Sequence, residues 1–466
     1  MMRRHGGTRF VRLLALLLVM AVAGVAGARK GRLRSDGSWI RDASGRVVLL
    51  RGINYSGLEF GNFFGAPHPP EEADFLQMAS WGVNVVRLPI AWHYLEPAPN
   101  QIDLDHLRGQ VDPIVRFAGR HGMVVVLEMH QFQWSPCTGG NGAPAWSCED
   151  GGYAHDAIGG FTAQHDFWAG ALAPDARPLV EHFLDVWRVL AHYYRQNRTI
   201  AAFNMLNEPI DALALDTFEA ETLYPTYRRW AAILRDEKAR QMVVLEPPVT
   251  RNLGIAAHPE PVVANALYAP HLYTETFGLP NLKYSGNRAA VDADYALASS
   301  EAAAQGAVLW VGEYGGNTEA AGGFLAATEL ALRHQLDEQD ERLVGGALWA
   351  YFPTDNTFSL VDAAGNEKGA LVDLLARPYP EATAGVPLAL HYDPDTRVLT
   401  YSFAEDPTQR IPDPTVLFVP FARHYPAGVI VETTPGDRAV VEPERDRILV
   451  RRDRSLAVHS VTVRPR

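Results

Sequence analysis

The sequence contains little cysteine. The only two cysteines in 466 residues are Cys137 and Cys148, and both lie in the stretch SPCTGGNGAPAWSC. A metal site would need more ligands close to them, so a metal centre at this loop is not expected. In an oxidising compartment the pair is expected to form one disulfide, which closes the loop and stabilises the fold by about 2–3 kcal/mol.

The sequence also lacks an excess of basic residues. It has 42 Lys and Arg against 54 Asp and Glu, which gives a formal net charge of −12 and a pI near 5.7. A protein that binds nucleic acid needs a basic face to displace counterions, so we expect no nucleic-acid partner. Aromatic residues are plentiful, with ten Trp and 17 Tyr, which suits stacking on sugar rings as well as ordinary cores.

The apolar run near the N-terminus is too short for a typical membrane span. It covers residues 13–25, against the roughly 20 residues that a span needs. Basic residues precede it and Ala-Gly-Ala follows, so residues 1–28 are predicted to be a cleavable signal peptide for secretion or periplasmic export. An uncleaved membrane anchor is the alternative. No cysteine stands directly after the apolar run, which argues against a bacterial lipid anchor.

Eight continuous apolar segments, each ending in polar or aromatic residues, alternate with stretches of helical period. Strands that are apolar on both faces and alternate with helices belong to a parallel sheet covered on each side. The segments therefore predict a (β/α)8 TIM barrel over residues 29–380, with GSWIRDASGRVVLL as a hairpin across its floor. The eight segments are VVLLRGIN, VNVVRLP, MVVVLEMH, AAFNMLNE, MVVLEP, NALYAPHLY, AVLWVGEYG and LVGGALWAYF.

The pattern of apolar and polar residues changes after the predicted barrel. Short alternating segments such as RVLTYSFAED, TVLFVPF and GVIVETT are broken by Pro, Gly and Asp. They predict an antiparallel β-sandwich over residues 386–466. This domain contains no visible catalytic cluster, and two roles stay open: packing on the barrel, or binding of substrate or membrane.

Polar side chains are expected at the mouth of the barrel, because functional groups project from the C-terminal ends of its strands. Each of them has a structural explanation when taken alone, such as a core histidine, an ion pair at the rim or ordinary packing. Polar groups at the ends of six strands would nevertheless be costly to bury on one face without a shared purpose. The residues are Arg87, His130, Asn207, Glu208, His271, Tyr273, Glu313 and Trp349.

Two of these residues, Glu208 and Glu313, are carboxylates on opposing strands, which is the arrangement that glycoside hydrolysis uses. One carboxyl group acts as acid and then as base, the other acts as nucleophile, and a separation of about 5–5.5 Å gives retention of configuration. Arg87 and Tyr273 are expected to hydrogen-bond Glu313 and hold it ionised. No metal or organic cofactor is expected, because the two carboxyl groups supply both acid and nucleophile.

The neighbouring residues suit a sugar. His130 and Asn207 are expected to bind hydroxyl groups next to the reacting carbon, and Trp349 is expected to form the floor of the sugar subsite.

The motifs NEP, GEYG, VRLP, MH and HLY, with a Trp ending the last strand, resemble those of glycoside hydrolase family five, the cellulase-like retaining enzymes. The resemblance covers roughly residues 45–355. It implies that Glu208 is the acid/base and Glu313 the nucleophile. It also carries substrate binding over to Arg87, His130, Asn207, His271, Tyr273 and Trp349.

A narrower resemblance concerns the substrate. ARPYPEATAGVP, followed by LHYDPDTRVLTYSF, is similar to the endoglycoceramidase-like branch, which releases an intact glycan from a glycosphingolipid. Two features depart from that branch: EMHQFQ has Phe132 in place of an Asp, and GINYSGLEFGNFF has no lysine. These departures concern the glycan headgroup more than the reaction.

The expected function is that of a secreted, monomeric, retaining β-glycoside hydrolase. Its substrate is expected to be a glycosphingolipid, with contact to a membrane surface or micelle. The alternatives are an endo-β-glucanase or mannanase, a steryl glucosidase and a carbohydrate-binding pseudoenzyme. A lipid substrate predicts exposed apolar groups on one flank of the mouth, for which the candidates are Phe60, Phe63, Phe64, Tyr224 and Phe277. Packing beneath the loops is the alternative for these side chains.

Overall fold

The computed structural model describes residues 31–61, 69–148, 151–353 and 357–466. The predicted signal peptide, residues 1–28, lies outside the described residues, as do Phe63 and Phe64. Among the described residues, none of the helices combines the length and apolar character that a transmembrane span requires.

Eight parallel strands close into a barrel in the order β10-β11-β4-β5-β6-β7-β8-β9, which confirms the predicted TIM barrel. Each strand overlaps one of the eight apolar segments of the sequence. Strands β5 and β6 pair over seven residues, from Val85 opposite Val124 to Ala91 opposite His130. The barrel strands are β4 (Arg51–Tyr55), β5 (Val85–Ala91), β6 (Val124–His130), β7 (Ile200–Asn204), β8 (Met242–Leu245), β9 (Ala266–Tyr268), β10 (Val308–Gly315) and β11 (Gly345–Tyr351).

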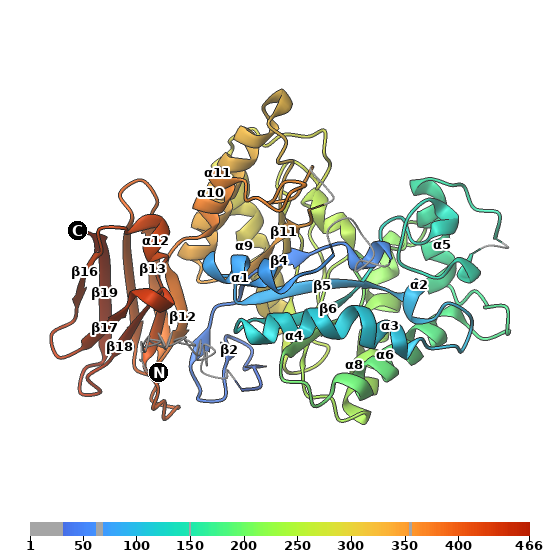
Figure 1. Ribbon diagram of the computed structural model, residues 1–466. Helices are drawn as coiled ribbons and strands as arrows, with labels where there is room; N and C mark the ends of the chain where they lie inside the picture. Colours follow the sequence, from blue (N-terminus) through green and yellow to red (C-terminus); the bar gives the residue numbers. More distant parts are fainter. Residues whose placement is uncertain (1–30, 62–68, 149–150, 354–356) are drawn as a thin grey trace, which may run out of the picture.

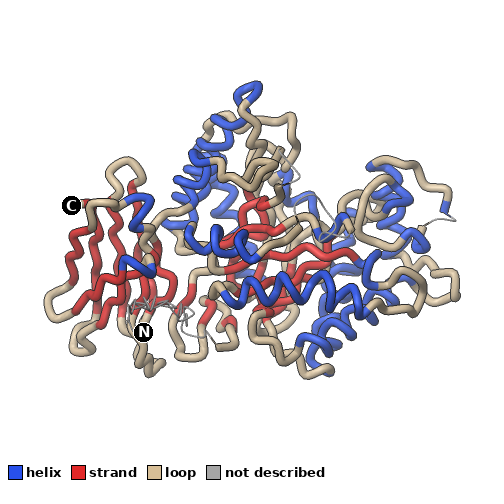
Figure 2. Tube along the Cα trace, in the orientation of Figure 1, coloured by secondary structure: helices blue, strands red, loops and turns tan. Residues whose placement is uncertain are grey.

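Helices surround the barrel (Figures 1 and 2). Helix α6 shows why they form, since it buries Leu179, Phe183, Trp187, Leu190 and Tyr194 at helical spacing. The helices are α1 (Glu72–Ser80), α2 (Trp92–Leu95), α3 (Leu104–His106), α4 (Asp112–Arg120), α5 (Ala157–Trp168), α6 (Leu179–Tyr194), α7 (Leu215–Thr217), α8 (Tyr224–Asp236), α9 (Arg288–Gln305), α10 (Phe324–Glu341) and α11 (Gly369–Leu375).

A hairpin closes the floor of the barrel, as predicted. It is built from β1 (Arg34–Ser35), β2 (Ile40–Arg41) and β3 (Val47–Val48). Gly45 takes φ +90 in the turn between β2 and β3, a conformation that glycine adopts readily. Ile40 and Val48 pack in one cluster with barrel residues such as Trp310. The barrel is therefore sealed at the N-terminal ends of its strands.

The C-terminal region forms the predicted β-sandwich. A sheet of order β13-β14-β19-β16 packs against a sheet of order β1-β2-β3-β12-β15-β18-β17, so the floor hairpin continues into the sandwich. The remaining elements are β12 (Tyr379–Thr383), β13 (Val386–Asp393), β14 (Val398–Ala404), β15 (Thr415–Phe418), α12 (Phe421–His424), β16 (Val429–Thr433), β17 (Arg438–Glu442), β18 (Arg447–Arg451) and β19 (Val458–Pro465).

The sandwich and the mouth of the barrel lie at opposite ends of the molecule. In Figure 1 the sandwich is on the left, beyond the start of β5, whereas the segment around α5 is on the right, beyond the end of β5. The sandwich is fixed to the barrel by ion pairs, among them Arg377 with Asp340 at 2.8 Å and Arg423 with Glu367 at 2.7 Å. These contacts favour a packing role for the domain.

The long segment between β6 and α6 covers one side of the mouth. Cys137 and Cys148 form the predicted disulfide within it, with their Cα atoms 6.3 Å apart. Trp146, between the two cysteines, donates a hydrogen bond to the carbonyl oxygen of Glu96 at 2.9 Å and stacks edge-on against Trp92. The disulfide loop is thereby attached to the barrel.

Candidate active site

Glu208 and Glu313 come from opposite sides of the barrel mouth. Glu313 lies within β10, but β7 ends at Asn204, so the prediction that this strand runs to Glu208 is wrong. The chain leaves the ladder after Asn204, and Glu208 has a φ of +46, a left-handed conformation that costs a non-glycine residue on the order of 1–3 kcal/mol. The side-chain amide of Gln131 holds this segment by donating to the carbonyl oxygens of Asn207 at 3.0 Å and Glu208 at 3.3 Å.

The two glutamates meet around one histidine. Glu208, His271 and Glu313 each contribute one side-chain oxygen or nitrogen atom, and these three atoms lie within 4.8 Å of one another. Inverting glycosidases hold their carboxyl groups about 6.5–9.5 Å apart to admit a water molecule. The shorter separation here corresponds to the retaining geometry.

Glu313 is buried and held by two donors, as the sequence predicted. Arg87 donates to one carboxylate oxygen at 2.7 Å and the Tyr273 hydroxyl donates to the other at 2.8 Å. Burial raises the pKa of Glu313, although His271 and Arg87 act in the opposite direction. Both oxygens therefore have fixed directions before a substrate arrives.

Arg87 lies at the centre of the site and is fully buried. Burial alone would lower its pKa, but Glu128, Glu246 and Glu313 outweigh burial and raise the pKa. A guanidinium group has five N–H donors, and all five are used here. Their acceptors are the side-chain oxygens of Asn54, Asn204, Asn207, Glu246 and Glu313.

Glu208 accepts hydrogen bonds from His271 Nδ1 at 2.8 Å and from the Asn252 amide at 2.6 Å. Burial would raise the pKa of Glu208, but these two partners lower it. Burial would also lower the pKa of His271, whereas Glu313 and Glu246 raise it to about 10. The directions of both shifts favour a charged His271 beside an ionised Glu208 in the substrate-free protein.

These pKa directions are the reverse of those that an acid at Glu208 and an anionic nucleophile at Glu313 need. The hydrogen bonds resolve the conflict. The His271 proton lies on a 2.8 Å bond to Glu208, so its transfer gives a neutral Glu208 without a change in total charge. Glu313 keeps the donors Arg87 and Tyr273, which stabilise its ionised form.

His130 and Trp349 form a second part of the mouth. Their rings stack with centroids 5.5 Å apart and an interplanar angle of 15°. His130 Nδ1 lies 3.1 Å from Glu128; burial alone would lower the pKa of His130, but Glu128 raises it to about 9. Trp349 is half-buried, so part of its ring is accessible to a ligand.

Several further residues at the site were missed in the sequence, and four of them show why. Glu128 and Glu246 are charged residues inside or directly after apolar strands, in MVVVLEMH and MVVLEP, so the same signal that identified Glu208 could have found them. Glu59 is fully buried, and Asn252 lies in a 3₁₀ helix, η8 (Val249–Leu253). Both lie in short 3₁₀ helices, η1 (Leu58–Phe60) and η8, which are too short to give a periodic signal.

The aromatic candidates for lipid contact differ in how far their side chains are exposed. Phe60 is 55% exposed and stacks on Phe352, and Phe277 is half-buried. Tyr224 is 1% exposed, so its prediction as an exposed group is wrong, because it begins α8 and packs against Tyr227. Phe132, which departs from the endoglycoceramidase-like pattern, is 57% exposed.

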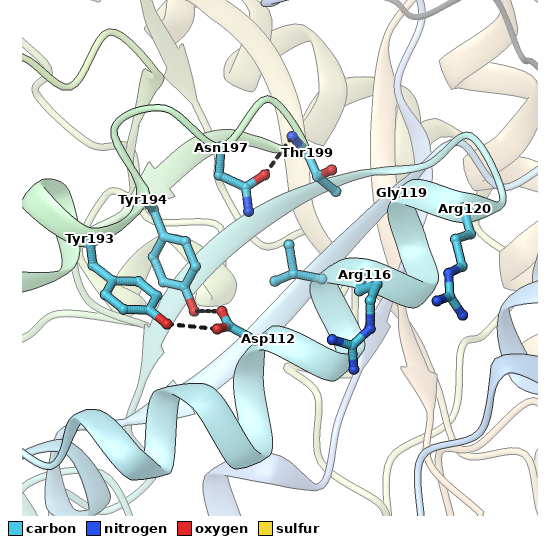
Figure 3. Close-up of a pocket in the computed structure, with 9 residues that line it drawn as sticks. Asp112, Arg116, Gly119, Arg120, Tyr193, Tyr194, Asn197 and Thr199 are labelled. Atoms are coloured by element: carbon cyan, nitrogen blue, oxygen red, sulfur yellow. Dashed lines mark hydrogen bonds between the residues drawn. The ribbon is translucent and has the colours of Figure 1, made fainter.

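A cavity of about 520 Å³ lies away from this site, between α4 and the end of α6 (Figure 3). Asp112, one of its lining residues, accepts hydrogen bonds from the hydroxyl groups of Tyr193 at 2.7 Å and Tyr194 at 2.9 Å. Arg120, another lining residue, pairs with Glu72 at 2.8 Å. Asp112 and Arg120 therefore already have partners within the protein, and we assign the cavity no catalytic role.

Activity is expected to survive chelators. Among the described residues, the Glu208, His271 and Glu313 cluster is the group whose geometry could hold a metal ion. These side chains already form hydrogen bonds with Arg87, with Tyr273 and with one another. The two carboxyl groups can supply the acid and the nucleophile without a metal ion. Hydrolysis of an aryl β-glycoside should be the same before and after dialysis against EDTA. A loss of activity that zinc or calcium restores would contradict this expectation.

A TIM barrel whose mouth holds two opposed glutamates 4.8 Å or less from a shared histidine defines a glycoside hydrolase. The chain belongs to glycosyl hydrolase family 5. The model of the cellulase domain of this family matches residues 41–353, and the model of the family 5 C-terminal domain matches residues 377–463.

The chain is similar to several characterised proteins. Endoglycoceramidase I of Rhodococcus hoagii is 25% identical over 438 residues, which cover 87% of this chain and 82% of that protein. Endo-glycoceramidase II from Rhodococcus sp., solved in a ganglioside GM3 complex, has 26% identity and a TM-score of 0.80 and covers 92% of this chain and 99% of its own. A structure of that protein as a lactosyl-enzyme intermediate has a TM-score of 0.78 and 26% identity, and the match covers 92% of this chain and 100% of that one.

A further similarity covers part of the chain. Ergosteryl-beta-glucosidase of Saccharomyces cerevisiae is 33% identical over 184 residues, which cover 34% of this chain and 22% of that protein.

Proposed function

We propose that this protein is a retaining β-glycoside hydrolase that cleaves the bond between the glycan and the lipid of a glycosphingolipid. The observation that carries the proposal is the short separation of Glu208 and Glu313 around His271. The similarity to two endoglycoceramidases over 87% and 92% of the chain supports the substrate class. The relative with a lactosyl-enzyme intermediate supports a covalent mechanism.

In this mechanism Glu313 is the nucleophile. Its carboxylate attacks the anomeric carbon and forms a covalent glycosyl-enzyme, while Glu208 protonates the leaving oxygen. Glu208 then removes a proton from a water molecule, which attacks the anomeric carbon and releases the glycan with its original configuration. Tyr273 and Arg87 keep Glu313 oriented through both steps.

The remaining side chains suit the sugar that carries the reacting carbon. Trp349 offers a ring for stacking, and His130 is fixed beside it by Glu128. The amide nitrogen of Asn207 donates to the Gln131 carbonyl oxygen at 3.2 Å and has a second N–H for a sugar hydroxyl.

The leaving group must approach Glu208, and the loops on this side carry exposed apolar side chains. These loops follow β7, β8 and β9, so they lie at the same end of the barrel as Glu208. Asn252, which bonds Glu208, is directly followed by Leu253, which is 59% exposed. We propose that this apolar rim contacts the hydrocarbon of the substrate within a micelle or membrane. It comprises Leu213, Leu215, Leu253, Ile255, Leu279 and Leu282.

Replacing Leu253 and Leu279 together by serine is expected to lower activity on glycosylceramide micelles about tenfold. Loss of two partly buried leucine contacts with lipid is worth roughly 1–2 kcal/mol. Hydrolysis of a soluble aryl β-glycoside should be unchanged. Leu388→Ser is the matched control, because Leu388 is 51% exposed on the sandwich at the other end of the molecule. Equal losses on both substrates would contradict a lipid role for the rim.

A steryl glucoside is the second candidate substrate, because of the similarity to ergosteryl-beta-glucosidase. A polysaccharide such as a β-glucan or mannan remains the alternative within the family. Initial rates on glycosylceramides, steryl glucosides and soluble β-glucans, measured side by side, separate the three. Higher kcat/KM on a soluble β-glucan than on every glycolipid would overturn the lipid proposal.

We also propose that the protein is exported and acts as a monomer. The basic and apolar pattern of residues 1–28 supports export. N-terminal sequencing of protein recovered from outside the cytoplasm should begin after residue 28, and light scattering should give one chain of 51.3 kDa less the signal peptide.

A further inference from the structure

A third buried carboxylate, Glu246, faces the catalytic pair from the end of β8. It is 2% exposed. It accepts hydrogen bonds from Arg87 at 2.7 Å and from the backbone N–H of Glu208 at 2.8 Å. Its own backbone is fixed on both sides by the Tyr227 hydroxyl, which donates to the Glu246 carbonyl oxygen at 2.9 Å and accepts from its N–H at 3.1 Å. The carboxylate is therefore held in one place.

Glu246 and Glu208 lie on the two sides of the His271 ring. Nδ1 of His271 bonds Glu208 at 2.8 Å, and Nε2 lies 3.5 Å from a Glu246 oxygen. Nε2 is buried and has no hydrogen-bond partner, so its environment there is set by the charge of Glu246. Glu313 is a third carboxylate that faces the ring, with an oxygen 3.6 Å from Nδ1.

We propose that Glu246 is a positioning residue that keeps the catalytic proton on the His271–Glu208 pair, so that Glu208 can deliver it to the leaving oxygen. This inference rests on the proposed function of Glu208 as general acid. Glu246 acts in two ways: it fixes the left-handed backbone of Glu208 through the N–H, and its negative charge retains the proton on the pair.

The sign of the charge effect does not depend on which member of the pair carries the proton. Removing a nearby negative charge lowers the affinity for a proton of both an imidazole and a carboxylate. The pair titrates as a unit, and loss of its proton ends general-acid catalysis on the basic side of the pH profile. Glu246 itself stays ionised, because His271 and Arg87 outweigh burial and lower its pKa to about 2.

The test is the pH dependence of kcat/KM for Glu246→Gln on a β-glycoside with a poor leaving group. The basic limb is expected to move to lower pH by about one unit, since a single nearby charge shifts a pKa by roughly 1–3 units. Glu246→Asp keeps the charge, so it should restore most of the wild-type limb. Glu338→Gln is the matched control: Glu338 is a buried glutamate on α10 that pairs with Arg288 at 3.0 Å and Arg342 at 3.1 Å, and its variant should leave the limb unchanged.

A basic limb that is the same in wild type and folded Glu246→Gln would overturn the proposal. If that variant does not fold, ¹⁵N-histidine and ¹³C-glutamate NMR of the wild-type protein decide instead, because the His271–Glu208 pair is expected to hold its proton at pH 8, on the imidazole or on the carboxyl group. Loss of that proton from the pair below pH 8 would overturn the proposal. Absence of any β-glycosidase activity in the wild type would contradict the proposed function rather than the role of Glu246.

Discussion

Replacing Glu313 by glutamine is expected to lower kcat/KM by roughly 10⁴-fold or more on every β-glycoside that the wild type hydrolyses. The amide is no nucleophile, so the glycosyl-enzyme cannot form, whatever the leaving group. Initial rates on an activated aryl glycoside and on a glycosylceramide measure the effect. Glu338→Gln, which removes a buried carboxylate far from the mouth, should retain activity on both.

Comparable losses of kcat/KM in Glu313→Gln and Glu338→Gln would show that Glu313 is not the nucleophile. Activity of Glu313→Gln within tenfold of wild type would show the same. A melting curve of each variant separates chemistry from folding, since Glu313 also receives a hydrogen bond from buried Arg87. An inactive variant with a wild-type melting temperature is the expected combination.

Replacing Glu208 by alanine is expected to lower the rate on substrates with a poor leaving group and to spare substrates with a very good one. General-acid catalysis contributes about 10²–10⁴-fold, and this is lost on a glycolipid, whose alkoxide is a poor leaving group. Formation of the glycosyl-enzyme from a dinitrophenyl glycoside needs no proton and should be nearly unaffected. Pre-steady-state release of dinitrophenol measures this step. Equal loss on both kinds of substrate would show that the acid and nucleophile are assigned wrongly.

The barrel could be predicted from the sequence because its strands are buried on both faces. A segment such as MVVVLEMH has no solvent face, so it appears as a continuous apolar run and identifies a strand by itself. The sandwich could be predicted because apolar and polar residues alternate along its strands, which is also a pattern within a single segment. The pairing of β3 with β12 joins residues more than 300 positions apart, and no local pattern reports such a contact.

The site was only partly predictable for a related reason. Glu208 and Glu313 stand at strand ends with recognisable neighbours, and the contacts of Glu313 with Arg87 and Tyr273 were expected. The irregular path from Asn204 to Glu208 was not, because the hydrogen bonds that support a φ of +46 come from Gln131 and Glu246, which directly follow β6 and β8. Strand endings set by such remote groups leave no periodic signal.

The exposed rim shows the same limit. Phe60 in the first loop is exposed, as predicted, but leucines and an isoleucine in the loops after β7, β8 and β9 are exposed as well, and no pattern in the sequence marked them. Tyr224 looked like a loop residue in ETLYPTY, yet it starts α8 and is buried. Exposure depends on which neighbours a loop meets, and composition does not reveal them.

Trapping the covalent intermediate tests the retaining mechanism most directly. A 2-deoxy-2-fluoro β-glycoside with a dinitrophenyl leaving group forms the glycosyl-enzyme but slows its hydrolysis, because fluorine disfavours the oxocarbenium-like transition states while the good leaving group favours the first step. Mass spectrometry of the intact protein and of its peptides should find one glycosyl adduct, on Glu313. An adduct on another residue, or a first product of inverted configuration with no adduct at all, would contradict this account.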